Sequence, residues 1–176
     1  LYTMHVAGKL PENSRILIIG RRDYDSAAYR ETARNWVEKF TRLPFRPADF
    51  QAFAGKIDYY RMDFSDHEAY RGLNRYYTGN RIGSHIFYFA VAPRFFSVIT
   101  EGLKLVDGAK NGKVIIEKPF GEDLAAAKTL NGELEDYFGP EQIYRIDHYL
   151  GKEMVRNIQA IRFTNPIFTD IWNSGH

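Results

Sequence analysis

Short apolar runs alternate along this chain with longer segments of helical pattern, and this alternation constrains the fold more than any other feature. Each run is rich in β-branched or aromatic residues and too short for a typical helix, as expected of strands buried in a parallel sheet. Strands that alternate with helices predict βαβ units, whose right-handed crossovers place helices on the faces of the sheet. The expected strands cover residues 15–20, 57–64, 85–91, 114–117 and 143–146.

The segments between these strands carry helix signals. Asp66 is expected to cap one helix, and the acidic pair Glu122 and Asp123 complements the dipole at the start of another. Pro44 and Pro47 predict a loop. Residues 1–10 are expected to end a further helix, and the other expected helices cover residues 25–41, 66–77, 95–103, 124–138 and 151–163.

The fold class is therefore α/β with a doubly wound parallel sheet. A dinucleotide-binding domain of this type opens with a strand and a G-x-G-x-x-G turn that seats a pyrophosphate at a helix N-terminus. The 176 residues contain no such motif. We therefore expect the chain to begin after that strand and turn, so that the sheet is incomplete.

Composition excludes several classes of function. There is no cysteine, which rules out disulfide scaffolds, thiol nucleophiles and cysteine-ligated metal sites. The 24 basic and 22 acidic residues nearly balance, so no electrostatic footprint for nucleic acid or an anionic membrane is present. The longest apolar run, 86–93, is far shorter than the ~20 residues of a spanning helix. No histidine spacing suggests a metal site, so none is expected.

Ligands of doubly wound sheets bind beyond the carboxyl ends of the strands, so the residues that follow each strand are the first candidates for chemistry. Arg21 and Arg22 follow the first strand. Arginine at this point of a dinucleotide fold accommodates the 2′-phosphate of NADP, because its planar fork forms bidentate bonds to phosphate. The alternative is a solvated basic turn that Asp23 neutralises, and the residues alone favour this alternative.

A second group follows the fourth strand, in the sequence EKPFG at 117–121. Pro119 restricts Lys118 to extended geometry, and the bond between them is a candidate for the cis form. Either feature would aim the ammonium group of Lys118 at an anion or carbonyl. The alternative is a surface lysine before an ordinary turn, and the motif alone does not decide between the two.

The densest cluster of chemically active side chains is RIDHYLGKE, at 145–153. His148 and Lys152 supply donors for a phosphoryl group, whereas Asp147 is suited to orienting an imidazole from elsewhere in the protein. Asp147 and His148 are adjacent, and on a strand they would point to opposite sides, so they are poor partners for each other. The alternative is a structural histidine beside a capping aspartate.

These motifs together resemble the glucose-6-phosphate dehydrogenase family. RIDHYLGKE and EKPFG resemble its two hallmark motifs, and similar segments cover nearly the whole chain. They are GKLPENSRILIIGRRDYD at 8–25, FYFAVAP at 87–93 and NIQAIRFTNPIFTDIWN at 157–173.

The resemblance implies an enzyme that oxidises D-glucose 6-phosphate to the 6-phosphoglucono-lactone and transfers hydride to NADP. It implies catalytic roles for Lys118 and for Asp147, which would pair with a catalytic histidine, and a cis Pro119. The sugar phosphate would be bound by Lys118, His148, Tyr149 and Lys152. The cofactor would be bound by Arg21, Arg22, Asp63, Phe64, Ala92, Pro93 and Lys118.

The sequence also departs from the family. The glycine-rich turn is absent, and the usual double proline after the third strand is Ala92–Pro93. The catalytic histidine of the family lies tens of residues beyond RIDHYLGKE, in a region that the chain does not contain. We therefore expect an internal piece of such an enzyme, with an incomplete NADP-binding Rossmann domain at 1–146 and the start of the substrate and dimerisation domain at 147–176.

The resemblance further implies a cytoplasmic homodimer or tetramer that acts in the oxidative pentose phosphate pathway, with no nucleic-acid or membrane partner. Use of both NAD and NADP stays open. Two alternatives also stay open. One is another sugar oxidoreductase with an E-K-P motif, and the other is a truncated, non-catalytic protein that binds a nucleotide or a partner.

Overall fold

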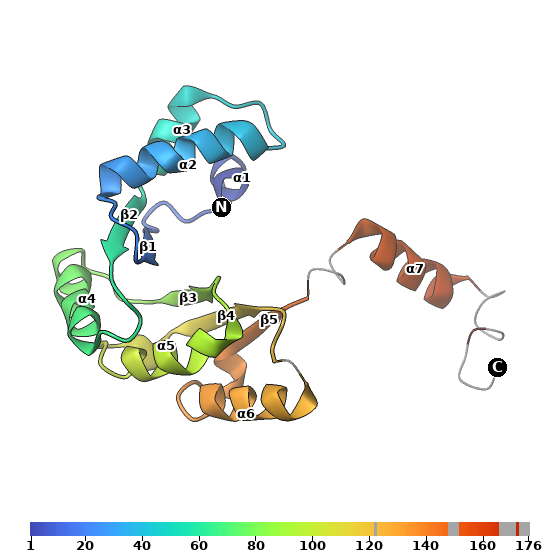
Figure 1. Ribbon diagram of the computed structural model, residues 1–176. Helices are drawn as coiled ribbons and strands as arrows, with labels where there is room; N and C mark the ends of the chain where they lie inside the picture. The colour runs from blue at the N-terminus through green and yellow to red at the C-terminus, as the bar shows by residue number, and fades with distance from the viewer. Residues whose placement is uncertain (122, 148–151, 166–171, 173–176) are drawn as a thin grey trace. The chain divides into compact units, whose positions relative to one another are not determined.

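The computed structural model describes residues 1–121, 123–147, 152–165 and 172. It divides into two compact units, Leu1–Ala69 and Tyr70–His176. Each unit has a sheet of parallel strands with helices packed against it (Figure 1). The expected α/β class with parallel strands is confirmed, and all five expected strands are present. The predicted domain boundary at 146/147 stays a prediction.

The first unit contains two parallel strands and three helices. Strand β1 (Ile16–Gly20) pairs with β2 (Ile57–Arg61) in the register Ile16↔Ile57 to Gly20↔Arg61. Aromatic and aliphatic side chains form its core, in which Tyr2, Ala33, Phe50, Phe53 and Ile57 are buried. Its elements are α1 (Tyr2–Val6), β1 (Ile16–Gly20), α2 (Ser26–Phe40), α3 (Pro47–Ala54) and β2 (Ile57–Arg61).

Helix α3 was not predicted, because Pro44 and Pro47 indicated a loop. In the structure Pro47 is the first residue of the helix, where proline is favoured because its missing N–H has no helical partner and its φ is already helical. Phe50 and Phe53 then lie on one face of α3 and are buried in the core. The proline is therefore a helix start.

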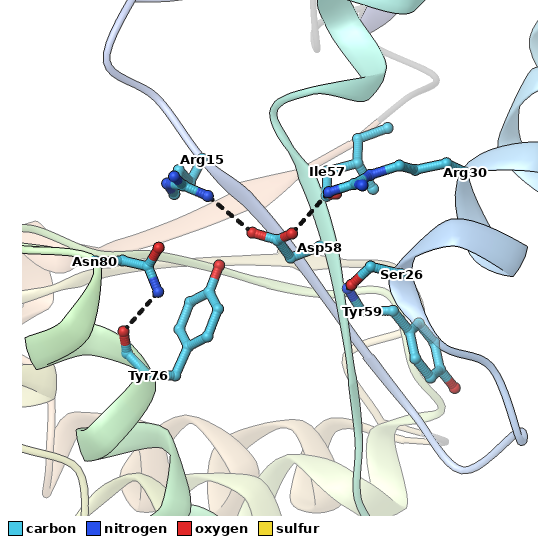
Figure 2. A network of polar contacts seen from close by, with 8 residues as sticks. All are labelled: Arg15, Ser26, Arg30, Ile57, Asp58, Tyr59, Tyr76 and Asn80. Carbon is cyan, nitrogen blue, oxygen red and sulfur yellow. Dashed lines mark hydrogen bonds and ion pairs between the residues drawn. The ribbon is translucent and has the colours of Figure 1, made fainter.

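Asp58 joins the sheet of the first unit to helix α2. Its two carboxylate oxygens accept hydrogen bonds from Arg15 at 3.0 Å and from Arg30 at 2.9 Å (Figure 2). The Nε of Arg30 also donates to the backbone carbonyl of Ile57, at 2.7 Å. These contacts lie at the amino end of β2, away from the strand ends where ligands of such sheets bind.

In the described residues, the second unit contains three parallel strands in the order β3 (Ile86–Phe89), β4 (Lys113–Glu117), β5 (Ile143–Ile146). Phe87 on β3 pairs with Val114 on β4, and Val114 pairs with Ile143 on β5, so these three residues lie side by side across the sheet. The dividing line between the units falls inside α4. The elements from α4 onward are α4 (His67–Gly79), β3 (Ile86–Phe89), η1 (Pro93–Phe95), α5 (Phe96–Leu103), η2 (Ala109–Asn111), β4 (Lys113–Glu117), α6 (Leu124–Glu135), η3 (Pro140–Gln142), β5 (Ile143–Ile146) and α7 (Glu153–Thr164).

Burial alternates along β3 and β4 of this second sheet. Phe89, Val114, Ile116 and Ile143 are buried, and α5 and α6 lie together on one side of the sheet (Figure 1). The intervening residues are more open, with Ile86 at 68% exposure. Successive side chains of a strand point to opposite faces, so the buried residues mark one face of the sheet and the more exposed residues mark the other.

Several predicted boundaries move by a few residues. Strand β2 ends at Arg61 rather than at Phe64, because Asp63 forms a tight turn with Ser65 and Asp66 then caps the next helix. The carboxylate of Asp66 accepts from the N–H of Ala69 at 3.2 Å, so the predicted cap is confirmed. Among the described residues, no helix is both long and apolar enough to cross a membrane.

Candidate active-site residues at the strand ends

The predicted cofactor residues of the first unit lie at one edge of its sheet. Arg21 and Arg22 follow β1, and Asp63 and Phe64 come two and three residues after the end of β2. Because β1 and β2 are parallel and their last residues, Gly20 and Arg61, are in register, both groups leave the sheet at the same edge. The family resemblance had named all four residues as cofactor ligands.

The arginine turn, defined as residues 20–25, has a charge arrangement that the sequence did not reveal. Asp23, which was expected to neutralise its neighbours, forms an ion pair of 2.8 Å with Arg61 on β2. Among the described residues, no ion pair involves the guanidinium of Arg21 or Arg22. Two cations at a strand end can bind an anionic group of a ligand.

Asp63 stays anionic at the same edge. Its Oδ1 accepts hydrogen bonds from the backbone N–H of Ser65 at 3.0 Å and from the Ser65 hydroxyl at 2.7 Å. These hydrogen bonds, helped by the charge of Arg21, lower the pKa of Asp63 below its usual value. The carboxylate therefore acts as a fixed acceptor beside the arginine turn.

In the second unit the structure joins the two predicted catalytic residues. Lys118 follows β4, Asp147 follows the neighbouring β5, and the ammonium group of Lys118 forms an ion pair with Asp147. The preceding residues, Glu117 and Ile146, are in register. The side chain of Lys118 is 43% exposed and that of Asp147 is 24% exposed, so neither is fully buried. The sequence placed both residues at strand ends but did not predict their contact.

The Lys118–Pro119 peptide bond is cis, as expected. Two residues further on, Gly121 has a positive φ of 155°. A Cβ atom there would lie 2.7 Å from the backbone nitrogen of Ala127 at the start of α6. The glycine of the EKPFG motif is thus required by the close approach of the motif to this helix.

Tyr88 lies beside the Lys118–Asp147 pair, and it was not identified from the sequence. Its hydroxyl donates a hydrogen bond to the carboxylate of Glu117 on the neighbouring strand, directly before Lys118. The hydrogen bond, partial burial and the charge of Glu117 raise the pKa of Tyr88 to about 12. The register, in which Tyr88 lies opposite Ile115, places Glu117 diagonally across from it, and only knowledge of strand order would have found the pair.

The remaining predicted residues are placed less fully. Ala92 and Pro93 lie at the start of η1 after β3, where the Ala92 carbonyl accepts from the N–H of Phe95 at 3.0 Å. Lys152 directly precedes α7 and is exposed. His148 and Tyr149 lie outside the described residues. No group of three or more metal-binding side chains gathers in the part of the chain that the structure describes.

In each unit, parallel strands carry charged side chains just beyond their carboxyl ends, the arrangement in which doubly wound α/β domains bind nucleotides and other ligands. The comparison with family models gives the same class and a particular family, because residues 1–157 match the model described as "Glucose-6-phosphate dehydrogenase, NAD binding domain". The chain belongs to the glucose-6-phosphate dehydrogenase family.

Curated relatives carry the same name. The chain is 35% identical over 175 residues to "Glucose-6-phosphate 1-dehydrogenase" of Dickeya dadantii, a match that covers 99% of the chain and 35% of that protein. It is 36% identical over 186 residues to "Glucose-6-phosphate 1-dehydrogenase 2" of Mycobacterium tuberculosis, a match that covers 99% of the chain and 36% of that protein. The chain thus spans about a third of the length of these relatives.

Solved structures agree on the fold. The crystal structure of glucose-6-phosphate 1-dehydrogenase from Mycobacterium avium has a TM-score of 0.80 at 29% identity, over 99% of this chain and 37% of that one. A glucose-6-phosphate dehydrogenase in complex with its substrate glucose-6-phosphate has a TM-score of 0.78 at 29% identity, over the same shares.

Proposed function

We propose that the full-length protein oxidises D-glucose 6-phosphate to the 6-phosphoglucono-lactone with NADP, the first step of the oxidative pentose phosphate pathway. The observation that carries this proposal is the contact between Lys118 and Asp147 at the ends of neighbouring strands, within the two hallmark motifs. The family and a relative in complex with glucose-6-phosphate support the choice of substrate.

Lys118 and Asp147 supply the polar groups near the reacting carbon. The reaction would remove a hydride from C1 and a proton from its hydroxyl, and a nicotinamide dinucleotide held at the strand ends would supply the hydride acceptor. A lysine ammonium placed between substrate and nicotinamide donates hydrogen bonds to the sugar and orients it. A carboxylate has two oxygens, so Asp147 can accept from Lys118 and also stabilise the imidazolium of the catalytic histidine that takes the proton.

Binding of the substrate phosphate falls to the residues that follow Asp147. We assign His148, Tyr149 and Lys152 to this phosphate, because histidine, tyrosine and lysine are all hydrogen-bond donors and one of them carries a fixed positive charge. This assignment rests on the match to RIDHYLGKE.

We assign cofactor binding to the strand-end residues that the family resemblance names. Arg21 and Arg22 would hold the adenosine 2′-phosphate, which favours NADP over NAD. Asp63, Phe64, Ala92 and Pro93 would line the cofactor, and Lys118 would contact it beside the substrate. We further propose a cytoplasmic homodimer or tetramer, which is the assembly and location that family membership suggests.

The first experiment is a spectrophotometric assay of the full-length protein for NADPH formation with glucose 6-phosphate. We expect Lys118→Ala to lower kcat/KM by roughly 100-fold or more, since an oriented hydrogen-bonding cation beside the reacting carbon is lost. Lys128→Ala, which removes an exposed lysine on α6, should leave kcat/KM unchanged.

Two results would refute the proposal. No turnover with any sugar phosphate would exclude the reaction, and normal kinetics of Lys118→Ala would exclude the assigned place of this lysine. Equal efficiency with glucose and glucose 6-phosphate would instead favour a sugar oxidoreductase that does not recognise the phosphate.

A further inference from the structure

The hydroxyl of Tyr59 holds the arginine turn in place through a hydrogen bond. It donates a hydrogen bond of 2.9 Å to the backbone carbonyl of Arg22. The backbone N–H of Tyr24 donates to the same carbonyl at 3.0 Å. Two donors on one carbonyl fix the orientation of the peptide that joins Arg22 to Asp23, in the middle of a turn that otherwise lies on the surface.

The ring of Tyr59 is itself held in place. It stacks on Tyr29 with ring centroids 5.1 Å apart, and Tyr24 meets it edge-on at 5.6 Å. Its backbone N–H donates to the hydroxyl oxygen of Ser26, the first residue of α2, at 2.9 Å; both residues are drawn in Figure 2. Tyr59 therefore ties the turn to strand β2 and to the start of α2.

Gly20 leaves room for this hydroxyl. A Cβ atom at position 20 would lie 2.9 Å from the Tyr59 hydroxyl oxygen but 3.6 Å from the nearest ring carbon. The first distance is too close for an unbonded pair, whereas the second is an ordinary van der Waals contact. The last residue of β1 is thus matched to the hydroxyl rather than to the ring.

From this arrangement we propose that Tyr59 is a positioning residue that sets the preference of the protein for a dinucleotide with a 2′-phosphate. The inference rests on the proposed function, in which Arg21 and Arg22 bind that phosphate. A turn held in one conformation before binding loses less entropy when the phosphate is bound, and this gain strengthens binding. A dinucleotide without the 2′-phosphate makes no contact with Arg21 and Arg22, so its affinity does not depend on the hydrogen bond from Tyr59.

The decisive experiment is calorimetric binding of two probes to the full-length protein: adenosine 2′,5′-bisphosphate, which carries the 2′-phosphate, and AMP, which lacks it. We expect Tyr59→Phe to raise the Kd of the bisphosphate by about threefold to tenfold, the range of one hydrogen bond. The Kd of AMP should not change. With NADP as coenzyme, KM should rise by a similar factor at constant kcat.

Tyr60→Phe is the matched control. Tyr60 is the next residue on β2, its side chain points to the opposite face, and its hydroxyl donates to the Ala69 carbonyl at 3.0 Å. The substitution therefore removes one tyrosine-to-carbonyl hydrogen bond away from the arginine turn. We expect a comparable loss of thermal stability and an unchanged ratio of the two Kd values.

Gly20→Ala tests the role of the Tyr59 hydroxyl without changing Tyr59 itself. It replaces Tyr59→Phe as the test if that variant does not fold. In the presence of Tyr59 it should displace the hydroxyl and weaken bisphosphate binding. In the Tyr59→Phe background it should have little further effect, because only the ordinary contact to the ring remains. Additive effects of the two substitutions would contradict the inference.

The outcomes separate the inference from the proposed function. If the wild-type protein binds the bisphosphate no more tightly than AMP, the assignment of Arg21 and Arg22 fails and the inference fails with it. If the wild type prefers the bisphosphate but Tyr59→Phe keeps the full preference, only the inference is overturned. Equal effects of Tyr59→Phe and Tyr60→Phe would reduce Tyr59 to a structural residue.

Discussion

At the scale of single residues, the protein shows how strand register creates electrostatic pairs. Tyr88 and Glu117 lie on neighbouring strands, and their hydrogen bond stabilises the neutral phenol against ionisation. Burial has a similar effect on Tyr77, whose pKa is also raised to about 12. Two tyrosines thus resist ionisation for different physical reasons.

We predict that a Glu117→Ala substitution lowers the pKa of Tyr88 toward its usual value of about 10 and leaves that of Tyr77 unchanged. The substitution removes both the hydrogen-bond acceptor and the negative charge that oppose ionisation of Tyr88. Ultraviolet titration of tyrosinate measures both groups. An unchanged number of tyrosines titrating near pH 12 would contradict the prediction.

The same shifts set a pH dependence of stability. A group whose folded pKa is raised binds its proton more tightly in the folded state, so its stabilisation is complete below about pH 10 and is lost as the pH rises through about 12. Glu117→Ala should therefore flatten the loss of stability between pH 10 and 12 relative to wild type, measured by urea unfolding at each pH.

At the scale of elements, the packing of α4 against α5 depends on a glycine, which has no side chain to block the contact. The ring of Tyr70 on α4 is buried against Gly102 on α5. A Cβ atom at position 102 would overlap this ring. Glycine costs helix stability, so its presence inside α5 is explained by the close approach of Tyr70.

We predict that Gly102→Ala destabilises the protein by about 1–3 kcal/mol through overpacking, despite the better helix propensity of alanine. Gly132→Ala is the matched control, since Gly132 also lies inside a helix, α6, but a Cβ atom at this position would enter open space. It should stabilise by about 0.5–1 kcal/mol. Chemical denaturation of both variants measures the difference, and two shifts of the same sign would contradict it.

The helices and strands also show which parts of the fold sequence patterns can predict. The strands are predictable because buried parallel strands have few alternatives to a continuous apolar run. The pattern misses helix α3 because proline both breaks helices and begins them, and only the packing of Phe50 and Phe53 decides which. Trp36 and Phe40 fit the apolar pattern of α2, yet they are 50% and 69% exposed in the structure.

At the scale of the whole molecule, the chain matches about a third of the length of its relatives while containing both hallmark motifs. In the family to which the chain belongs, the catalytic histidine lies tens of residues beyond the RIDHYLGKE motif. We therefore predict that a protein limited to residues 1–176 forms no NADPH with glucose 6-phosphate. Circular dichroism of the short protein verifies that it is folded, and turnover by it would place the base within these residues.

The sequence by itself determined the fold class, the family and the strand-end positions of Arg21, Lys118 and Asp147. It could do so because strand periodicity and motif order are local properties of the chain. Only the tertiary structure decided which charges meet: Lys118 with Asp147, and Asp23 with Arg61 rather than with its neighbours. These partners lie 29 and 38 residues apart, and strand order and register bring them together.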